Sequence, residues 1–245
     1  MMATGNHHVY VKHAVDSINR FLMPEIRKDV LILSDSLVPM VQALGWNCVI
    51  HTRRCPSFNK SSHIFELMLQ NLDLISQADF CYKLDADISV HQYISSEDIL
   101  PLASQDFSIV RNFGWSREYM MSIQPKTFSA VIPSKFQHGP YWIACLFGGR
   151  TENIVVMAEE LDKMIKRDRE NKTMWGAWEE PYVNYYFAIR EPQVRTLSPA
   201  YASPLYWHIF PDEARAAYQK MTDNMPVKIF HFNHTPDNYG HHVIG

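Results

Sequence analysis

Two aspartates, Asp85 and Asp87, directly follow an apolar run over 80–84 and are the residues of this sequence best suited to chemistry. Side chains two residues apart on an extended chain point to the same side, so these carboxylates can act together. Two carboxylates make a hard, anionic oxygen site that suits Mg²⁺ or Mn²⁺, which also binds waters and phosphate oxygens. The pattern predicts a divalent cation site, with two solvated acids at a strand end as the alternative.

A second pair of acids, Glu179 and Glu180, stands directly before Pro181. Proline is favoured in the first turn of a helix, and the helix dipole stabilises acids there. The pair therefore predicts the start of a helix, and this structural explanation holds whether or not the acids also do chemistry.

Alternating elements must position the first pair of acids. The expected elements are a helix over 11–22, strands over 29–35 and 46–52, a helix over 62–75 and a strand over 80–84. Strands and helices that alternate at this spacing predict βαβ units and a mainly parallel sheet. Ligands of such sheets bind beyond the carboxyl ends of the strands, where Asp85 and Asp87 fall.

The first strand of the chain, over 1–4, is expected to be short. The second half of the sequence does not continue the regular alternation of strands and helices. The expected elements are strands over 107–111 and 141–147, loops and short strands over 112–140, and helices over 154–165 and 183–189. The last ~45 residues are rich in proline, histidine and aromatic residues, which favours irregular structure.

Composition excludes several classes of protein. The 245 residues, 47% hydrophobic and 20% charged, describe a globular chain and not a disordered one. A net charge of −3 without a run of Lys or Arg argues against a nucleic-acid partner. No apolar window of ~18 residues and no basic-then-apolar start occur, so we expect no transmembrane segment. Four cysteines without CxxC spacing suit a reducing compartment, and we expect a soluble, cytoplasmic protein.

An ordered set of motifs resembles glycosyltransferase family 6 over essentially the whole chain. No single motif is specific, but their order and spacing are typical of the family. The matching segments are Ala3-Thr4-Gly5, 33–35, 80–87, 141–149, 178–185 and 196–201. The resemblance implies a GT-A fold, an α/β fold with a Rossmann-like, mainly parallel central sheet flanked by helices and a smaller acceptor-side lobe.

The resemblance also implies how the chain is divided. A single domain over 1–245 would contain a nucleotide-binding half over 1–90, a donor and acceptor half over 91–225, and a tail over 226–245 that covers the donor.

The activity implied by the resemblance is a retaining α-1,3 transfer of galactose or N-acetylgalactosamine from UDP to a galactose-containing glycan. Asp85 and Asp87, around Ala86, match the family's metal-binding acids, and the cofactor would be Mn²⁺ or Mg²⁺, which offsets charge on the UDP leaving group. Glu180 matches the catalytic glutamate, which would stabilise or attack the oxocarbenium-like carbon. Glu179 matches an acid that contacts donor or acceptor hydroxyls.

The stretch Ile143-Ala144-Cys145 matches the segment that selects the donor sugar in this family. The residue that matches Cys145 is glycine in the blood-group A transferases of the family and alanine in the blood-group B transferases. Cysteine is larger than alanine and leaves less room for a 2-acetamido group. The resemblance therefore favours UDP-galactose over UDP-N-acetylgalactosamine, and the alternative is that these three residues only fill the sheet core.

Further donor contacts are implied at both ends of the chain. Ala3 and Thr4 would lie under the base and the ribose, and His7 matches a tyrosine that packs near the uridine. In the tail, His234 would contact the diphosphate, with His231 as a second contact.

Trp115, Trp142 and Trp178 are the candidates for a wall on which an acceptor sugar stacks, with a structural role as the alternative for each. The family's His-Pro pair in this region is missing from the sequence, so the acceptor cannot be inferred from the resemblance. Two other functions stay open: a non-catalytic sugar- or nucleotide-binding protein on the same fold, and a hydrolase of UDP-sugars.

Overall fold

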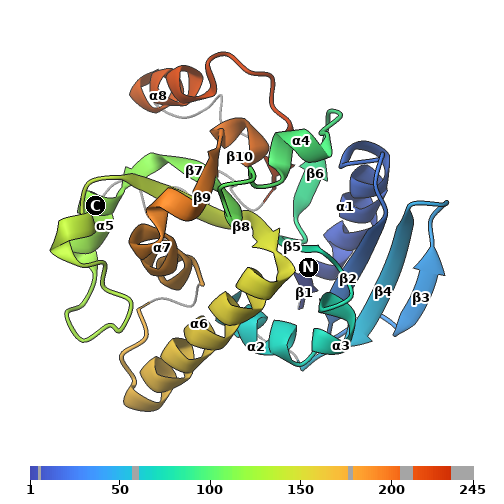
Figure 1. Cartoon of the computed structure of the whole chain (residues 1–245), viewed down its shortest axis with the longest axis horizontal. Coiled ribbons are helices and arrows are strands. Elements are labelled where there is room, and N and C mark those ends of the chain that lie inside the picture. The colour runs from blue at the N-terminus through green and yellow to red at the C-terminus, as the bar shows by residue number, and fades with distance from the viewer. Residues whose placement is uncertain (5–6, 57–60, 176–178, 205–211, 233–245) are drawn as a thin grey trace. The chain divides into compact units, whose positions relative to one another are not determined.

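The computed structural model describes residues 1–4, 7–56, 61–175, 179–204 and 212–232 and has the mixed α/β fold that the sequence predicts (Figure 1). The chain forms two compact units that are built from interleaved segments. The first is drawn from Met1–Ser57, Leu84–Ile99 and Leu197–Gly245, and the second from Phe58–Lys83 and Leu100–Thr196. The expectation of a single domain stays a prediction.

The first unit contains a four-stranded sheet. Its strands, in sheet order, are β1 (Met2–Ala3), β2 (Lys28–Ser34), β4 (Cys48–Arg54) and β3 (Met40–Ala43). The predicted parallel pairing is confirmed for β1, β2 and β4, and β1 is as short as expected. Helix α1 (His8–Phe21) buries Val11 and Val15 in one cluster with Ile32 and Ile50 of the sheet.

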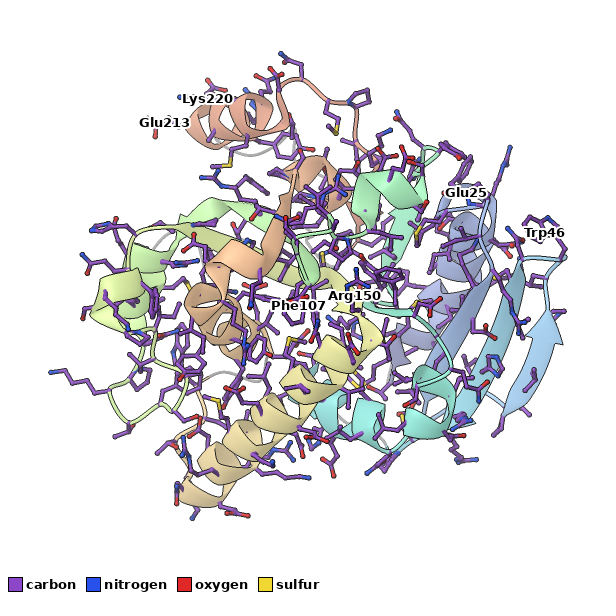
Figure 2. The ribbon with its side chains drawn as sticks, in the orientation of Figure 1. Glu25, Trp46, Phe107, Arg150, Glu213 and Lys220 are labelled. Atoms are coloured by element: carbon purple, nitrogen blue, oxygen red, sulfur yellow. The ribbon has the colours of Figure 1, made fainter. Side chains whose placement is uncertain are left out.

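The edge strand β3 is antiparallel to β4 and was not predicted. All four of its residues are exposed, so its sequence lacks the alternation of apolar and polar residues by which a half-buried strand is recognised. Trp46, in the connection that leads from β3 to β4, is exposed as well (Figure 2).

A second sheet of the first unit joins β6 (Ile88–Val90) to two strands from late in the chain, β11 (Ile229–His231) and β10 (Ser203–Pro204). Strand β11 lies antiparallel to β6 and parallel to β10. Helix α4 (Ser96–Ile99) follows β6 in the chain.

The prediction that the last ~45 residues are irregular was wrong, because they contain β10, β11 and helix α8 (Asp212–Thr222). In α8, Tyr218 and Thr222 are buried while Glu213 and Lys220 are exposed (Figure 2). Most of the apolar residues of α8 are alanines, which mark an apolar face only weakly, and the prolines and histidines around the helix favoured irregular structure.

The second unit holds a sheet with the order β5 (Phe80–Leu84), β8 (Pro140–Arg150), β7 (Phe107–Ser116) and β9 (Val194–Leu197). Strands β7 and β8 are antiparallel. The described strands thus form three sheets, with antiparallel pairs beside the parallel ones, where the sequence predicted one mainly parallel central sheet. Apolar runs such as 107–111 and 141–147 are equally typical of buried strands in either direction, which explains the difference.

The helices of the second unit are α2 (Ile64–Leu69), α3 (Leu72–Ile75), α5 (Arg117–Ile123), α6 (Thr151–Asn171) and α7 (Glu180–Ile189). Helices α6 and α7 confirm two predictions, and Pro181 lies in the first turn of α7 as expected. Helix α5 and the end of β7 occupy part of 112–140, where loops and short strands were predicted. The helix predicted over 62–75 is interrupted at Asn71, whose side-chain amide donates to the Leu67 carbonyl oxygen.

Gly148 and Gly149, at the end of β8, allow neighbouring strands to approach closely. A Cβ atom on Gly148 would collide with the Tyr82 ring and the Cys81 carbonyl oxygen, and one on Gly149 with the Asp106 carbonyl oxygen. The two glycines that close the predicted strand are therefore required by packing.

Asn184 joins α7 to β8. Its side chain accepts a hydrogen bond from the Trp142 backbone N–H and donates to the Trp142 carbonyl oxygen, both at 2.8 Å. It also donates to the carbonyl oxygen of Glu180 at 3.0 Å. Phe107, at the start of β7, packs edge-on against Phe187 of the same helix. These contacts fix the start of α7, where Glu180 lies, against the sheet.

We expect Asn184→Ala to lower the free energy of unfolding by about 2–4 kcal/mol, because it leaves buried backbone groups of Trp142 without their partner. Urea unfolding followed by circular dichroism measures the change. The matched control is Asn171→Ala, at the exposed end of α6, with an expected effect within about 0.5 kcal/mol. Equal effects of the two substitutions would contradict the role given to Asn184.

Candidate functional site

Asp85, Asp87 and His231 form a compact cluster in the first unit. The antiparallel pairing of β6 and β11 places His231 opposite Ile88, and the Phe232 N–H donates to the Asp87 carbonyl oxygen at 2.8 Å. The Nε2 atom of His231 lies 3.4 Å from Oδ2 of Asp85 and 3.3 Å from Oδ1 of Asp87. The sequence predicted the two carboxylates to act together, and the structure brings them to one imidazole.

The charges within this cluster balance one another. Burial alone would lower the pKa of His231, but hydrogen bonds to Asp85 and Asp87 and the charges of both carboxylates raise it to about 10. The imidazole is therefore charged at neutral pH and offsets one of the two carboxylates.

The residues of this cluster fit a divalent cation. One ligand atom from each of the three side chains can be chosen so that all lie within 4.8 Å of one another. Asp87 is only 2% exposed, and its Oδ2 atom is buried without a hydrogen-bond partner among the described residues. A buried carboxylate oxygen without a partner is costly, and a cation bound there would remove the cost.

A second cluster, in the second unit, is built around the backbone of Ala144. The Ala144 N–H donates to Oε2 of Glu180 at 3.1 Å. The Ala144 carbonyl oxygen accepts from Nζ of Lys83 at 2.7 Å, and Nζ also donates to Oε1 of Glu179 at 2.6 Å. Lys83 and Glu179 are both buried. Ala144, in the segment expected to select the donor, thus binds Glu180, the glutamate expected to be catalytic. Through Lys83 it is also linked to Glu179.

Glu180 has a strongly altered acidity. Burial raises its pKa from the ordinary value of 4.5 to about 7, against the opposing effect of the hydrogen bond from Ala144. The charge of Glu179 raises the pKa further and the charge of Lys83 lowers it. Glu180 therefore changes its protonation near neutral pH, which is common for acids in functional sites.

The other residues expected to contact the donor are mostly buried. Ala3 and Ala86 belong to one core cluster of the first unit, and Thr4, which follows Ala3, is buried as well. Ile143 and Cys145 are buried in β8. The Nδ1 atom of His7, which is half-buried, lies 3.3 Å from the Thr4 carbonyl oxygen. These placements leave the predicted donor contacts untested.

The structure argues against one member of the expected acceptor wall. Trp142 is 0% exposed, lies under the Arg117 guanidinium, packs against Phe187 and donates its indole N–H to Thr196. Its ring belongs to the core, because the side chains around it leave no face on which a sugar could stack. Trp115 is half-buried and tilted against the Tyr141 ring.

Trp178 and His234 lie outside the described residues, so their predicted contacts stay predictions.

Lys83 was missed by the sequence reasoning. A lysine inside an apolar strand signals a buried charge that needs a partner, and this signal was available in 80–84. Tyr141 was also not predicted as a neighbour of Glu180. Burial and the charge of Glu180 raise the pKa of Tyr141, so its hydroxyl stays protonated.

Comparison with known proteins decides the family. A family model described as glycosyltransferase family 6 matches residues 1–209. The chain belongs to glycosyltransferase family 6. The suspected resemblance is confirmed, and this family 6 glycosyltransferase uses a nucleotide-sugar donor and a glycan acceptor, as the family implies.

The matched segment contains Asp85, Asp87, Glu179 and Glu180 but ends before His231. None of the curated proteins compared with the chain matches it. Among the described helices of this glycosyltransferase, none is both long and apolar enough to cross a membrane.

We expect the pH dependence of stability to report the altered acidity of Glu180. Between pH 4.5 and about 7 the folded state holds a proton that the unfolded state releases, so Glu180 contributes stability that is lost as the pH rises. Glu180→Gln should therefore gain stability relative to the unmodified protein over this range, on the order of 2 kcal/mol.

Urea unfolding at several pH values between 5 and 8 tests this expectation. The exposed Glu159→Gln on α6 is the control, and its stability should run parallel to that of the unmodified protein. A parallel curve for Glu180→Gln as well would show that the pKa of Glu180 is not raised.

Proposed function

We propose that this family 6 glycosyltransferase transfers galactose from UDP-galactose to a galactose-containing glycan in α-1,3 linkage, with retention and with Mn²⁺ or a similar ion. The observation that carries the proposal is the convergence of Asp85 and Asp87, with one buried oxygen of Asp87 left without a partner in the described chain. Two convergent carboxylates with an unfilled oxygen support a cation, and a cation supports a diphosphate leaving group.

Asp85 and Asp87 would hold the cation. When bound, the ion would offset the negative charge that builds on the diphosphate as the bond to the sugar breaks. Asp87 is held in place by the hydrogen bond that its carbonyl oxygen accepts from Phe232. Asp85 is partly exposed, which leaves it accessible to a ligand from solvent.

Glu180 would act on the anomeric carbon. The N–H of Ala144 orients one oxygen of its carboxyl group, and the hydrogen bonds of Asn184 fix the helix turn from which it projects. An ionised carboxylate can stabilise an oxocarbenium-like carbon or form a covalent bond with it. The pKa of about 7 means that a substantial fraction of Glu180 is ionised at neutral pH.

The donor sugar in this proposal is galactose, with N-acetylgalactosamine as the alternative. The support is the size of the Cys145 side chain at the position that selects the donor in the family. Cys145 is buried in β8. It directly follows Ala144, whose N–H donates a hydrogen bond to Glu180.

Hydrolysis of UDP-sugars is the second candidate function. Burial of Trp142 removes one of the residues expected to hold an acceptor glycan. A site that binds the donor and lacks a bound acceptor can transfer the sugar to water.

We expect Mn²⁺ to tighten the binding of UDP at least about tenfold, and Asp87→Asn to abolish this effect. Calorimetry of UDP binding with and without Mn²⁺ measures it. UDP release from UDP-galactose and from UDP-N-acetylgalactosamine, in the presence of a glycan array, then separates transfer from hydrolysis and compares the donors.

Three results would contradict parts of this proposal. An affinity for UDP that is the same with and without Mn²⁺ would exclude Asp85 and Asp87 as ligands of the cation. Equal turnover of both donors would remove the argument from Cys145. UDP release without any glycosylated product would favour the hydrolase.

We expect Glu180→Gln to lower turnover at least about 100-fold while UDP binding changes little, because the amide keeps the hydrogen bond from Ala144 and loses the charge. Initial rates of UDP release measure the loss. Glu159→Gln serves as the control with unchanged rates. Full turnover by Glu180→Gln would refute its assignment as the catalytic residue.

A further inference from the structure

We propose that His231 is a third protein ligand of the divalent cation and binds it through Nε2 together with Asp85 and Asp87. The inference rests on the proposed function and deepens it. The family match ends at residue 209 and does not reach His231, for which the sequence resemblance implied a contact with the diphosphate and not with the cation.

Strand pairing brings His231 to the two aspartates. Strand β11 is the central strand of its sheet, between β10 and β6, and His231 is paired with Ile88 on one side and with Pro204 on the other. Asp87 immediately precedes Ile88, and its carbonyl oxygen accepts the Phe232 N–H. Backbone pairing on both sides therefore fixes the position of His231 beside the two aspartates.

The separations of the three side chains suit one cation. The Nε2 atom lies 3.4 Å from an oxygen of Asp85 and 3.3 Å from one of Asp87. Two ligands at about 2.1 Å from an ion and at right angles lie about 3 Å apart, so small movements of the side chains would complete the site.

A plain ion pair between His231 and the aspartates is the rival explanation. An ion pair leaves Oδ2 of Asp87 buried and without a partner in the described part of the chain. Asp87 is 2% exposed and His231 5% exposed, so water does not readily compensate that oxygen. A cation that takes the place of the imidazole proton would use both the nitrogen and this oxygen.

An imidazole ligand has a consequence for metal choice. Nitrogen ligands suit Mn²⁺, Co²⁺ or Zn²⁺ better than they suit Mg²⁺ or Ca²⁺, which prefer oxygen. As a ligand, His231 should therefore make the site favour Mn²⁺ over Mg²⁺.

Electron paramagnetic resonance of Mn²⁺ bound to the full chain with UDP tests the proposal. The spin-echo modulation of the bound ion should show a directly coordinated histidine nitrogen, and this signal should be lost in His231→Gln and His231→Ala. Both variants should bind Mn²⁺ at least about tenfold more weakly, since even indirect partners of metal ligands contribute that much. Their affinity for Mg²⁺ should fall less.

His91→Gln is the matched control, because His91 is an exposed histidine directly after β6. It should keep both the nitrogen signal and the affinity for Mn²⁺. Circular dichroism and thermal unfolding show whether each variant is folded. The nitrogen signal of the unmodified chain tests the proposal even where a variant fails to fold.

The outcomes separate this inference from the proposed function. Loss of Mn²⁺ in Asp87→Asn with unchanged binding in both His231 variants would overturn the inference and leave the function standing. A nitrogen signal that persists in His231→Ala belongs to another residue and would also overturn it. Failure of the unmodified chain to bind Mn²⁺ with UDP would overturn the inference together with the metal-dependent function, and formation of a glycosylated product shows whether any transfer activity remains.

Discussion

The cost of burying carboxylates is the constraint on which both clusters of this protein depend. A buried charge destabilises a protein unless it is paired and hydrogen-bonded. In the first unit the imidazole of His231 lies between Asp85 and Asp87 and offsets one of their two charges. In the second unit the ammonium of Lys83 compensates Glu179 at 2.6 Å. Such arrangements contribute little to stability, so the positions they give the carboxylates are their main consequence.

Backbone pairing supplies the precision in each cluster. In the first, the register of β6 and β11 places His231 beside Asp87. In the second, the N–H of Ala144 in β8 binds Glu180, while its carbonyl oxygen binds Lys83. Groups carried by sheet strands are held more closely than groups on loops, which suits a reaction that depends on distance.

The sequence predicted much of the fold and the carboxylates of both clusters, but not the basic side chains that pair with them. Helix α7 and the strand before Asp85 were predicted because apolar runs and Pro181 are local signals. Strand β3 was missed because all of its residues are exposed, and helix α8 was missed because most of its apolar residues are small alanines. The contact of His231 with Asp87 depends on strand register across a long stretch of chain, which no local pattern reports. The burial of Trp142 favours the structural alternative, which the sequence left open because an aromatic residue gives the same signal in a core and in a sugar site.

The two neighbouring glutamates show how one site obtains acids of different character. The ammonium group of Lys83 donates a hydrogen bond to Glu179, whereas Glu180 accepts one from the neutral backbone amide of Ala144. Burial raises the pKa of Glu180 to about 7, although the hydrogen bond from Ala144 lowers it. The ion pair with Lys83 fixes the position of Glu179, whereas burial gives Glu180 a carboxyl group that changes its protonation near neutral pH.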